Sequence, residues 1–264
     1  MQEFLHDVPD VLYKYRDWNN PNHKRLLESQ ELYFSSIDQF NDPFDGTIPY
    51  RYKPEELTEE NIFLKYYQIT KRGYPNWKEE QIHEHCFHYQ QMGHFHDEKY
   101  MDDFEADTLK QINQDFGIVC LCKERDNFLL WSHYSNSHKG FCVGFNKKLL
   151  FEDTGAGFAH MQYEEELPTL NLFDNVFETF KKLIGTKSKT WKYEDEYRLT
   201  RIYYSRTKVI LRKETVVEII LGCKMEQAEK FNILDLAARE YPHARVYDMK
   251  LSKTKFEIEI MQIR

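Results

Sequence analysis

The chain of 264 residues is acidic and rich in aromatic side chains, with 18 Tyr and 19 Phe. Lys and Arg total 36 against 44 Asp and Glu, and the net charge of −8 argues against general coating of nucleic acid or of an anionic membrane. No apolar run approaches the roughly 20 residues that cross a bilayer, and the opening residues lack a secretory pattern. We therefore expect a cytoplasmic protein without a membrane anchor.

The N-terminal part alternates between short strands and turns. Residues 11–16 alternate aromatic and basic side chains, which predicts a half-buried strand. An Asn-Asn-Pro sequence at 19–21 is typical of a helix start, and a second short strand is expected over 32–35. Residues 38–46 then form a loop rich in Asp, Asn and aromatic residues, with a bend fixed by proline.

Residues 54–114 change to the apolar spacing of helices. Residues 55–107 hold 13 acidic and 5 basic side chains, so 5 − 13 gives this segment a charge of −8. We predict an acidic helical insertion or cap within a single domain. Its five histidines suggest a metal site, yet no HExxH motif is present and we expect no metal; these histidines are His83, His85, His88, His94 and His96.

The second half mixes strands and helices, so the predicted fold class is α+β. Residues 116–122 and 140–145 are expected as buried strands on either side of a short helix, 127–134. The five cysteines include no CxxC pair, which predicts buried thiols. Further strands are expected over 196–204, 216–221, 244–248 and 256–260, and helices over 170–184 and 226–240.

One stretch of the chain is basic. Residues 181–213 hold 11 basic and 3 acidic side chains, so 11 − 3 gives this stretch a charge of +8. Such an asymmetry indicates a ligand that carries phosphate. The alternative is a solvated helix end and strand edge, and the sequence leaves both open.

A pair of glutamates lies inside this basic stretch. If residues 194–200 form a strand, alternation places Glu194, Glu196 and Arg198 on one face, with the two carboxylates about 7 Å apart. Such a pair can divide labour, because one carboxylate stabilises developing positive charge while the other orients or deprotonates a nucleophile. The alternative is a salt-bridge ladder of the kind that exposed strands form.

Four stretches resemble the signature blocks of a widespread bacterial family of unknown function. That family is in turn similar to the ADP-ribosyltransferase superfamily, which presents an Arg or His on the first strand, a Ser on the second and a Glu-x-Glu pair before a later strand. The resemblance implies an ADP-ribosyltransferase-like split sheet with a helical insertion. The four stretches are LYKYR (12–16), LYFSSIDQFNDPFDG (32–46), LLWSHYSNSHKGFCVGF (129–145) and WKYEDEYRL (191–199).

The resemblance implies an enzyme that transfers ADP-ribose from NAD to a nucleic acid or a protein. A toxin or anti-phage effector restrained by an antitoxin is one role that it implies. Glu196 would act beside the ribose 2′-hydroxyl, and Glu194 would meet the acceptor. Arg16, whose planar fork suits charged oxygens better than an amine, would hold a phosphate or ribose oxygen. Ser35 or Ser36 would position Glu196.

Further residues are expected near the same cleft. Tyr15, Phe44 and His133 would line it, although the Phe44 loop and His133 also fit purely structural roles. An acceptor that carries phosphates would be attracted by Lys187, Lys189 and Lys192.

Two other functions remain open from the sequence. A non-catalytic nucleotide or nucleic-acid sensor would need the basic face without a carboxylate pair aimed into a pocket. A metal-dependent nuclease or phosphoesterase would need several acids around one divalent ion; the candidates are Asp42, Asp45, Glu194 and Glu196, with Lys192 beside them.

Overall fold

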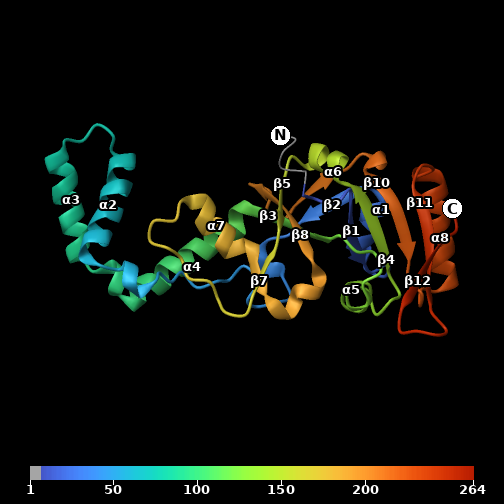
Figure 1. The fold of residues 1–264 in the computed structure, drawn as a ribbon. Coiled ribbons are helices and arrows are strands. Elements are labelled where there is room, and N and C mark those ends of the chain that lie inside the picture. Colours follow the sequence, from blue (N-terminus) through green and yellow to red (C-terminus); the bar gives the residue numbers. More distant parts are fainter. Residues whose placement is uncertain (1–6) are drawn as a thin grey trace. The chain divides into compact units, whose positions relative to one another are not determined.

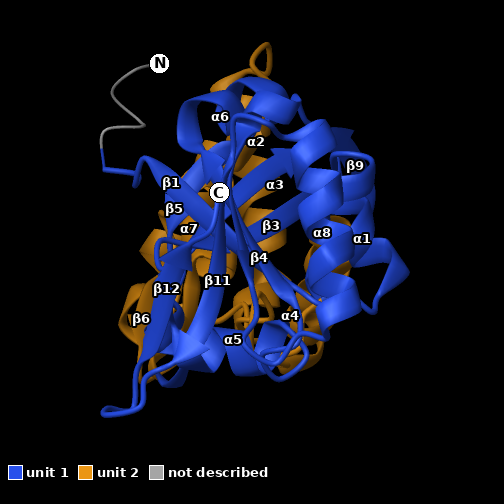
Figure 2. Cartoon of the chain, turned by 90° about the vertical axis from the view of Figure 1, so that its right-hand side faces the viewer, with its two compact units in different colours: residues 1–39, 114–161, 190–264 blue, residues 40–113, 162–189 orange. Residues whose placement is uncertain are grey.

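The computed structural model describes residues 7–264 and divides the chain into two compact units. Unit 1 takes residues up to 39, 114–161 and 190–264, and unit 2 takes residues 40–113 and 162–189, as Figure 2 shows in two colours. Each unit is assembled from separate stretches of sequence, because the chain leaves unit 1 twice and returns twice. The predicted insertion at 54–114 falls in unit 2 except for its last residue.

Unit 1 is built on a mixed sheet of eight strands (Figure 1). Its strands are parallel between β10 and β11 and antiparallel at the other pairings. A separate antiparallel pair joins β2 (Glu31–Phe34) to β9 (Thr207–Ile210). In spatial order the eight strands are β12 (Ile258–Gln262), β11 (Arg245–Leu251), β10 (Val216–Leu221), β4 (Phe141–Asn146), β1 (Val11–Arg16), β3 (Phe116–Cys122), β8 (Glu196–Ile202) and β5 (Gly157–His160).

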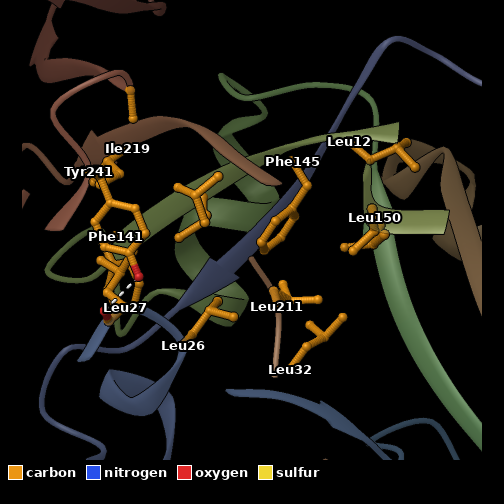
Figure 3. Packing of buried hydrophobic residues seen from close by; sticks show 14 of the residues in the cluster. Leu12, Leu26, Leu27, Leu32, Phe141, Phe145, Leu150, Leu211, Ile219 and Tyr241 are labelled. Atoms are coloured by element: carbon orange, nitrogen blue, oxygen red, sulfur yellow. Dashed lines mark hydrogen bonds between the residues drawn. The ribbon is translucent and has the colours of Figure 1, made fainter. Parts of the chain in front are cut away.

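The larger core packs on one face of this sheet. Helices α1 (Pro21–Glu28), α6 (Lys147–Thr154) and α8 (Gln227–Glu240) supply side chains to it. Figure 3 shows residues of this cluster, including the hydrogen bond that Tyr241 donates to the carbonyl of Leu27 at 2.7 Å. Side chains from the strands complete the cluster; among them are Leu12, Leu121, Phe141, Val143, Phe145, Tyr197, Leu199 and Ile219.

The opposite face carries a smaller core under α5 (Phe128–Tyr134). Trp131 packs edge-on against Tyr15 with ring centroids 5.2 Å apart, and its Nε1 donates to the carbonyl of Arg125 at 2.9 Å. Asn127 caps the helix through the backbone N–H groups of Leu129 and Leu130. The loop between β3 and α5 is therefore tied to the helix that follows it.

Unit 2 is mostly helical. Its helices are α2 (Glu59–Gly73), α3 (Glu79–Gln91), α4 (Glu98–Asp115, whose last two residues belong to unit 1) and α7 (Val176–Gly185), with 3-10 turns η3 (Pro54–Glu56) and η4 (His94–His96). A short parallel pair joins β6 (Gln162–Glu164) to β7 (Thr186–Ser188). Within residues 7–264, no helix combines the length and apolar character that crossing a membrane requires.

The predicted α+β class is confirmed by this mixture of helices and a large mixed sheet. The five cysteines are free thiols, as the sequence predicts, but Cys120 and Cys223 are only partly buried. The predicted helix over 170–184 begins later, at Val176, where Asn175 forms a capping box with Glu178. Strands β5, β6, β7 and β9 and helix α6 were not predicted.

Candidate functional site

Glu194 and Glu196, in the stretch WKYEDEYRL (191–199), lie on either side of a sharp turn. Glu194 ends the 3-10 helix η5 (Lys189–Glu194), Asp195 adopts a left-handed conformation with φ 43°, and Glu196 begins β8. Strand alternation therefore begins at Glu196, and the prediction that Glu194 shares the strand is wrong. Non-glycine residues adopt positive φ at a cost, and such residues cluster at functional sites.

Glu196 is buried against an arginine of its own strand. Arg198, two residues further along β8, lies on the same face, and its Nε donates to Glu196 Oε1 at 2.6 Å. Its Nη2 reaches Oε2 at 3.5 Å, so the guanidinium fork faces both carboxylate oxygens. Both side chains are almost fully buried. Two hydrogen bonds from one guanidinium fix the direction of the carboxylate.

Glu194 accepts a hydrogen bond from a residue of α5. Tyr134 Oη donates to Glu194 Oε1 at 2.7 Å, and Glu194 is also buried. The exposed ring of His133 lies beside the half-buried rings of Trp191 and Tyr193, with centroids 6.3 and 6.2 Å away. A group of aromatic rings therefore lies next to Glu194.

Asp195, between the two glutamates, is held by two basic side chains. It accepts a hydrogen bond from His160 at 2.6 Å and forms an ion pair with Lys123. Burial raises the pKa of Asp195, but the hydrogen bonds from Lys123 and His160 outweigh burial and hold that pKa below its ordinary value. The ends of β3 and β5 are therefore connected to the turn that separates Glu194 from Glu196.

Register across the sheet shows which residues share a face with Glu196. Glu196 pairs with Cys122, Cys122 pairs with Tyr13, and Tyr13 pairs with Gly144 on β4. Partners in an antiparallel pair point to the same face, so these residues form one row on the α5 side. Gly144 pairs in turn with Glu218 of β10, which places a second buried glutamate at the far end of this row.

Arg16 lies on the other face of the same sheet. It is three residues from Tyr13 and pairs with Phe141, which belongs to the larger core. The charge of Arg16 nevertheless interacts with Cys120, which shares a face with Glu196 and Arg198, so the predicted convergence of Arg16 and Glu196 on one ligand stays a prediction. Burial lowers the pKa of Arg16 to about 10.

Lys14 occupies the space where β1 and β3 separate. Its Nζ donates to the carbonyl of Cys120 at 2.7 Å, and the side chain is buried. Burial, together with the positive charge of Arg16, lowers the pKa of Lys14 to about 7, and Glu196 partly offsets this by raising it. Lys14 is thus a buried amine under the electrostatic influence of the Glu196 carboxylate.

Neither serine of the second strand positions Glu196. Ser35 pairs with Ile118, and Ile118 pairs with Thr200. Thr200 is four residues beyond Glu196 along β8, or about 13 Å at 3.3 Å per residue. Ser36 is buried and accepts a hydrogen bond from Arg206 Nε at 3.2 Å. The predicted role of a serine is therefore wrong, and Arg198 takes it.

The other predicted cleft residues have different surroundings. Tyr15 is buried, and its hydroxyl donates to the carbonyl of Glu124 at 2.7 Å. His133 is exposed in the ring group beside Glu194. Phe44 belongs to unit 2, where it is exposed and lines a cavity of about 180 Å³ with Ile48 and residues 164–168 and 186–188.

The basic stretch is largely neutralised by acids from elsewhere in the sequence. Lys187 is buried, with its Nζ 3.5 Å from Asp45, so its amine does not face solvent. Lys189 pairs with Glu165 at 2.5 Å on the surface, and Lys192 is exposed. Further ion pairs join Lys182 to Asp174, Arg206 to Asp38, Lys208 to Glu31, Arg212 to Glu152 and Asp153, and Lys213 to Glu240.

Within residues 7–264, no group of three or more His, Cys, Asp or Glu side chains is arranged to hold a metal ion. Four histidines of unit 2 pack against rings, namely His83, His85, His88 and His94. His94 stacks on Tyr100 with centroids 3.9 Å apart, and His85 lies 5.3 Å from Trp77.

Comparison with known proteins yields one family. Residues 130–199 match the model of DUF2971, a protein family of unknown function. The matched segment contains Tyr134, Glu194, Glu196 and Arg198, and it supports the expected relation to an uncharacterised family. A search of curated proteins and a search of solved structures each returned no match.

Proposed function

We propose that this chain is an ADP-ribosyltransferase-like enzyme that transfers ADP-ribose from NAD to a macromolecular acceptor. The observation that carries the proposal is the buried Glu196 carboxylate, which a buried Arg198 guanidinium grips 2.6 Å away beside a left-handed turn. A carboxylate held ionised and rigid before substrate arrives can stabilise positive charge that develops during a reaction. Loss of nicotinamide from NAD develops such a charge at the ribose anomeric carbon.

The reaction balances without a further reactant. The bond between the anomeric carbon and the nicotinamide nitrogen breaks, and its electron pair neutralises the departing pyridinium ring. A nucleophilic oxygen or nitrogen of the acceptor then forms a bond to the same carbon and loses its proton. During loss of nicotinamide, the Glu196 carboxylate faces the ribose. During attack by the acceptor, Glu194 receives the proton; the Tyr134 hydroxyl donates to Glu194 Oε1 at 2.7 Å and orients it.

The ring group next to Glu194 suits the leaving base. Trp191, Tyr193 and His133 offer flat surfaces on which a nicotinamide ring can stack. Asn127 fixes this group, since its Nδ2 donates to the carbonyl of Tyr193 at 2.6 Å while its Oδ1 caps α5.

The test is nicotinamide release from NAD by the purified full chain. We expect Glu196→Gln to lower the rate by a factor of about 100 to 1,000, because one preorganised charge of this kind is lost. The matched control is Glu218→Gln, which changes a buried glutamate in the same row of the same sheet. Equal rates for wild type and Glu196→Gln, at equal thermal stability, would contradict the proposal.

The acceptor is found with biotin-labelled NAD and bacterial extract. Label that nuclease removes identifies nucleic acid, and label that protease removes identifies protein. We further propose that transfer harms the producing cell, as in a toxin or anti-phage effector controlled by an antitoxin. Expression of wild type should then slow growth while Glu196→Gln does not, and equal growth of both strains would contradict this.

A further inference from the structure

The helical hairpin of unit 2 has a thin core and an apolar outer surface. Helices α2 and α3 lie side by side (Figure 1), but their fully buried residues are few, namely Ile62, Thr70, Ile82 and Cys86. Large apolar side chains remain exposed on both helices, including Phe87 at 55% and Ile69 at 54%. Surfaces of this kind mark interaction sites when apolar and polar side chains are arranged together.

One face of α3 has such an arrangement. The side chains at the spacing of one helix face line a shallow open depression; they are Glu80, His83, Glu84, Phe87, His88 and Gln91. Phe63 of α2 supports it from beneath, with its ring centroid 4.9 Å from Phe87 and 5.6 Å from His83. The depression therefore has aromatic rings at its centre and carboxylates along its length.

Those carboxylates are not neutralised within the hairpin. Glu79 is paired with Lys71 at 2.9 Å, but Glu80 and Glu84 make no ion pair within residues 7–264. They lie in the stretch 55–107, where 13 acidic against 5 basic side chains leave a charge of −8. A nucleic acid or a second copy of this acidic hairpin would meet like charge there, which opposes association.

We propose that this face of α3 is a docking surface for a basic amphipathic helix of a partner protein. An apolar side chain of that helix packs on Phe87 and Phe63, and flanking Lys or Arg side chains pair with Glu80 and Glu84. This docking surface lies within unit 2, and its binding of a basic helix is independent of the proposed enzymatic activity.

The experiment uses the full chain and a synthetic 18-residue peptide of Leu and Lys, with Leu at helical spacing, as the probe. Binding is measured by fluorescence anisotropy at low and high salt. We expect Phe87→Ser to weaken binding about tenfold, and Glu80→Lys with Glu84→Lys to weaken it further and to reduce its salt dependence. A scrambled peptide of equal composition should bind at least tenfold more weakly.

Matched controls separate the docking surface from general acidity. Phe231→Ser removes an even more exposed ring from α8, and Asp103→Lys with Asp107→Lys makes the same charge change on exposed positions of α4. Equal losses from the α4 and α3 charge changes, or unchanged binding by Phe87→Ser, would overturn the proposal. It would also be overturned if sedimentation showed wild-type dimers that Phe87→Ser dissociates, because the occupant would then be a second copy.

Discussion

Two buried glutamates on the same row of the sheet have different surroundings. Glu218 accepts from Arg125 at 2.8 Å, Arg245 at 2.5 Å and Tyr13 at 2.9 Å, and the two arginine side chains are 33% and 54% exposed. Glu196 is held by Arg198, whose side chain is 1% exposed. The two ends of the row are about 19 Å apart, taking four strand spacings of 4.8 Å.

The exposure of the paired arginines distinguishes a structural anchor, Glu218, from a candidate reactive group, Glu196. Around Glu218 the cations reach water, so their desolvation is partial and several donors share the carboxylate. Around Glu196 the guanidinium is fully desolvated, which makes each partner depend strongly on the other. A fold gains little stability from such a pair, so its presence calls for another reason.

The largest effect is expected from Arg198→Met. Removing one partner leaves the Glu196 charge buried without its guanidinium, and the free energy of unfolding should fall by about 3 to 5 kcal/mol. Adding Glu196→Leu should recover most of the loss, because an apolar pair needs no compensation. Urea denaturation measures both; a loss under 1 kcal/mol for the single variant would break the contrast with Glu218.

The next effect concerns pH and Lys14. The folded protein releases the Lys14 proton at a pKa of about 7, while the unfolded chain keeps it to about 10.5. The unfolded state therefore binds more protons between these values, and stability rises with pH. Wild type should gain about 2 kcal/mol from pH 7 to 9 relative to Lys14→Met, by urea denaturation.

The pKa of Lys14 gives a second way to tell the two glutamates apart, because Glu196 raises it. Glu196→Gln removes a charge that raises the pKa of Lys14, so the pH window should begin lower. Glu218→Gln should leave the window unchanged. If both variants move it alike, the assumed proximity of Lys14 to Glu196 is wrong.

A smaller loss is expected at the Glu218 end. Tyr13→Phe removes the hydroxyl that donates to the buried carboxylate at 2.9 Å, and the free energy of unfolding should fall by about 1.5 kcal/mol. Tyr15→Phe is a neighbouring control, since it removes a hydroxyl that donates to a neutral carbonyl and should cost about 1 kcal/mol. A larger loss for Tyr15→Phe would contradict this order.

The smallest effect belongs to Arg245→Ala. Its side chain is about half exposed, and Glu218 keeps Arg125 and Tyr13, so the loss should be about 0.5 kcal/mol. Thermal unfolding at low and high salt measures it, and salt should reduce the difference from wild type. A loss comparable to that of Arg198→Met would remove the distinction between the two clusters.

Apolar patterning predicted the central elements well. Residues 216–221 are predicted as a strand and form β10, and the predicted 127–134 helix begins one residue later as α5. Their side chains are buried, so the pattern records the fold directly. Strands β5 and β9 escaped prediction because half or more of their residues are exposed and no apolar alternation marks them.

The candidate site was predicted in part. The Glu194–Glu196 block was singled out, but the left-handed turn at Asp195 has no glycine to signal it, so both acids were assigned to one strand. The face of Arg16 depends on pairing register, which no local pattern specifies. Strand alternation also places Arg198 on the face of Glu196, and the structure confirms this placement.

The interrupted layout of unit 1 has a consequence for synthesis on the ribosome. Strand β1 ends at Arg16, while its neighbours β3 and β4 end at Cys122 and Asn146. At about 5 to 20 residues per second, the first strand waits several seconds or longer for its neighbours. The helices of residues 40–113, the first segment of unit 2, form contacts between residues close in sequence and can fold during that delay. The nascent chain therefore presents the aromatic strand β1 before the sheet neighbours of that strand have been synthesised.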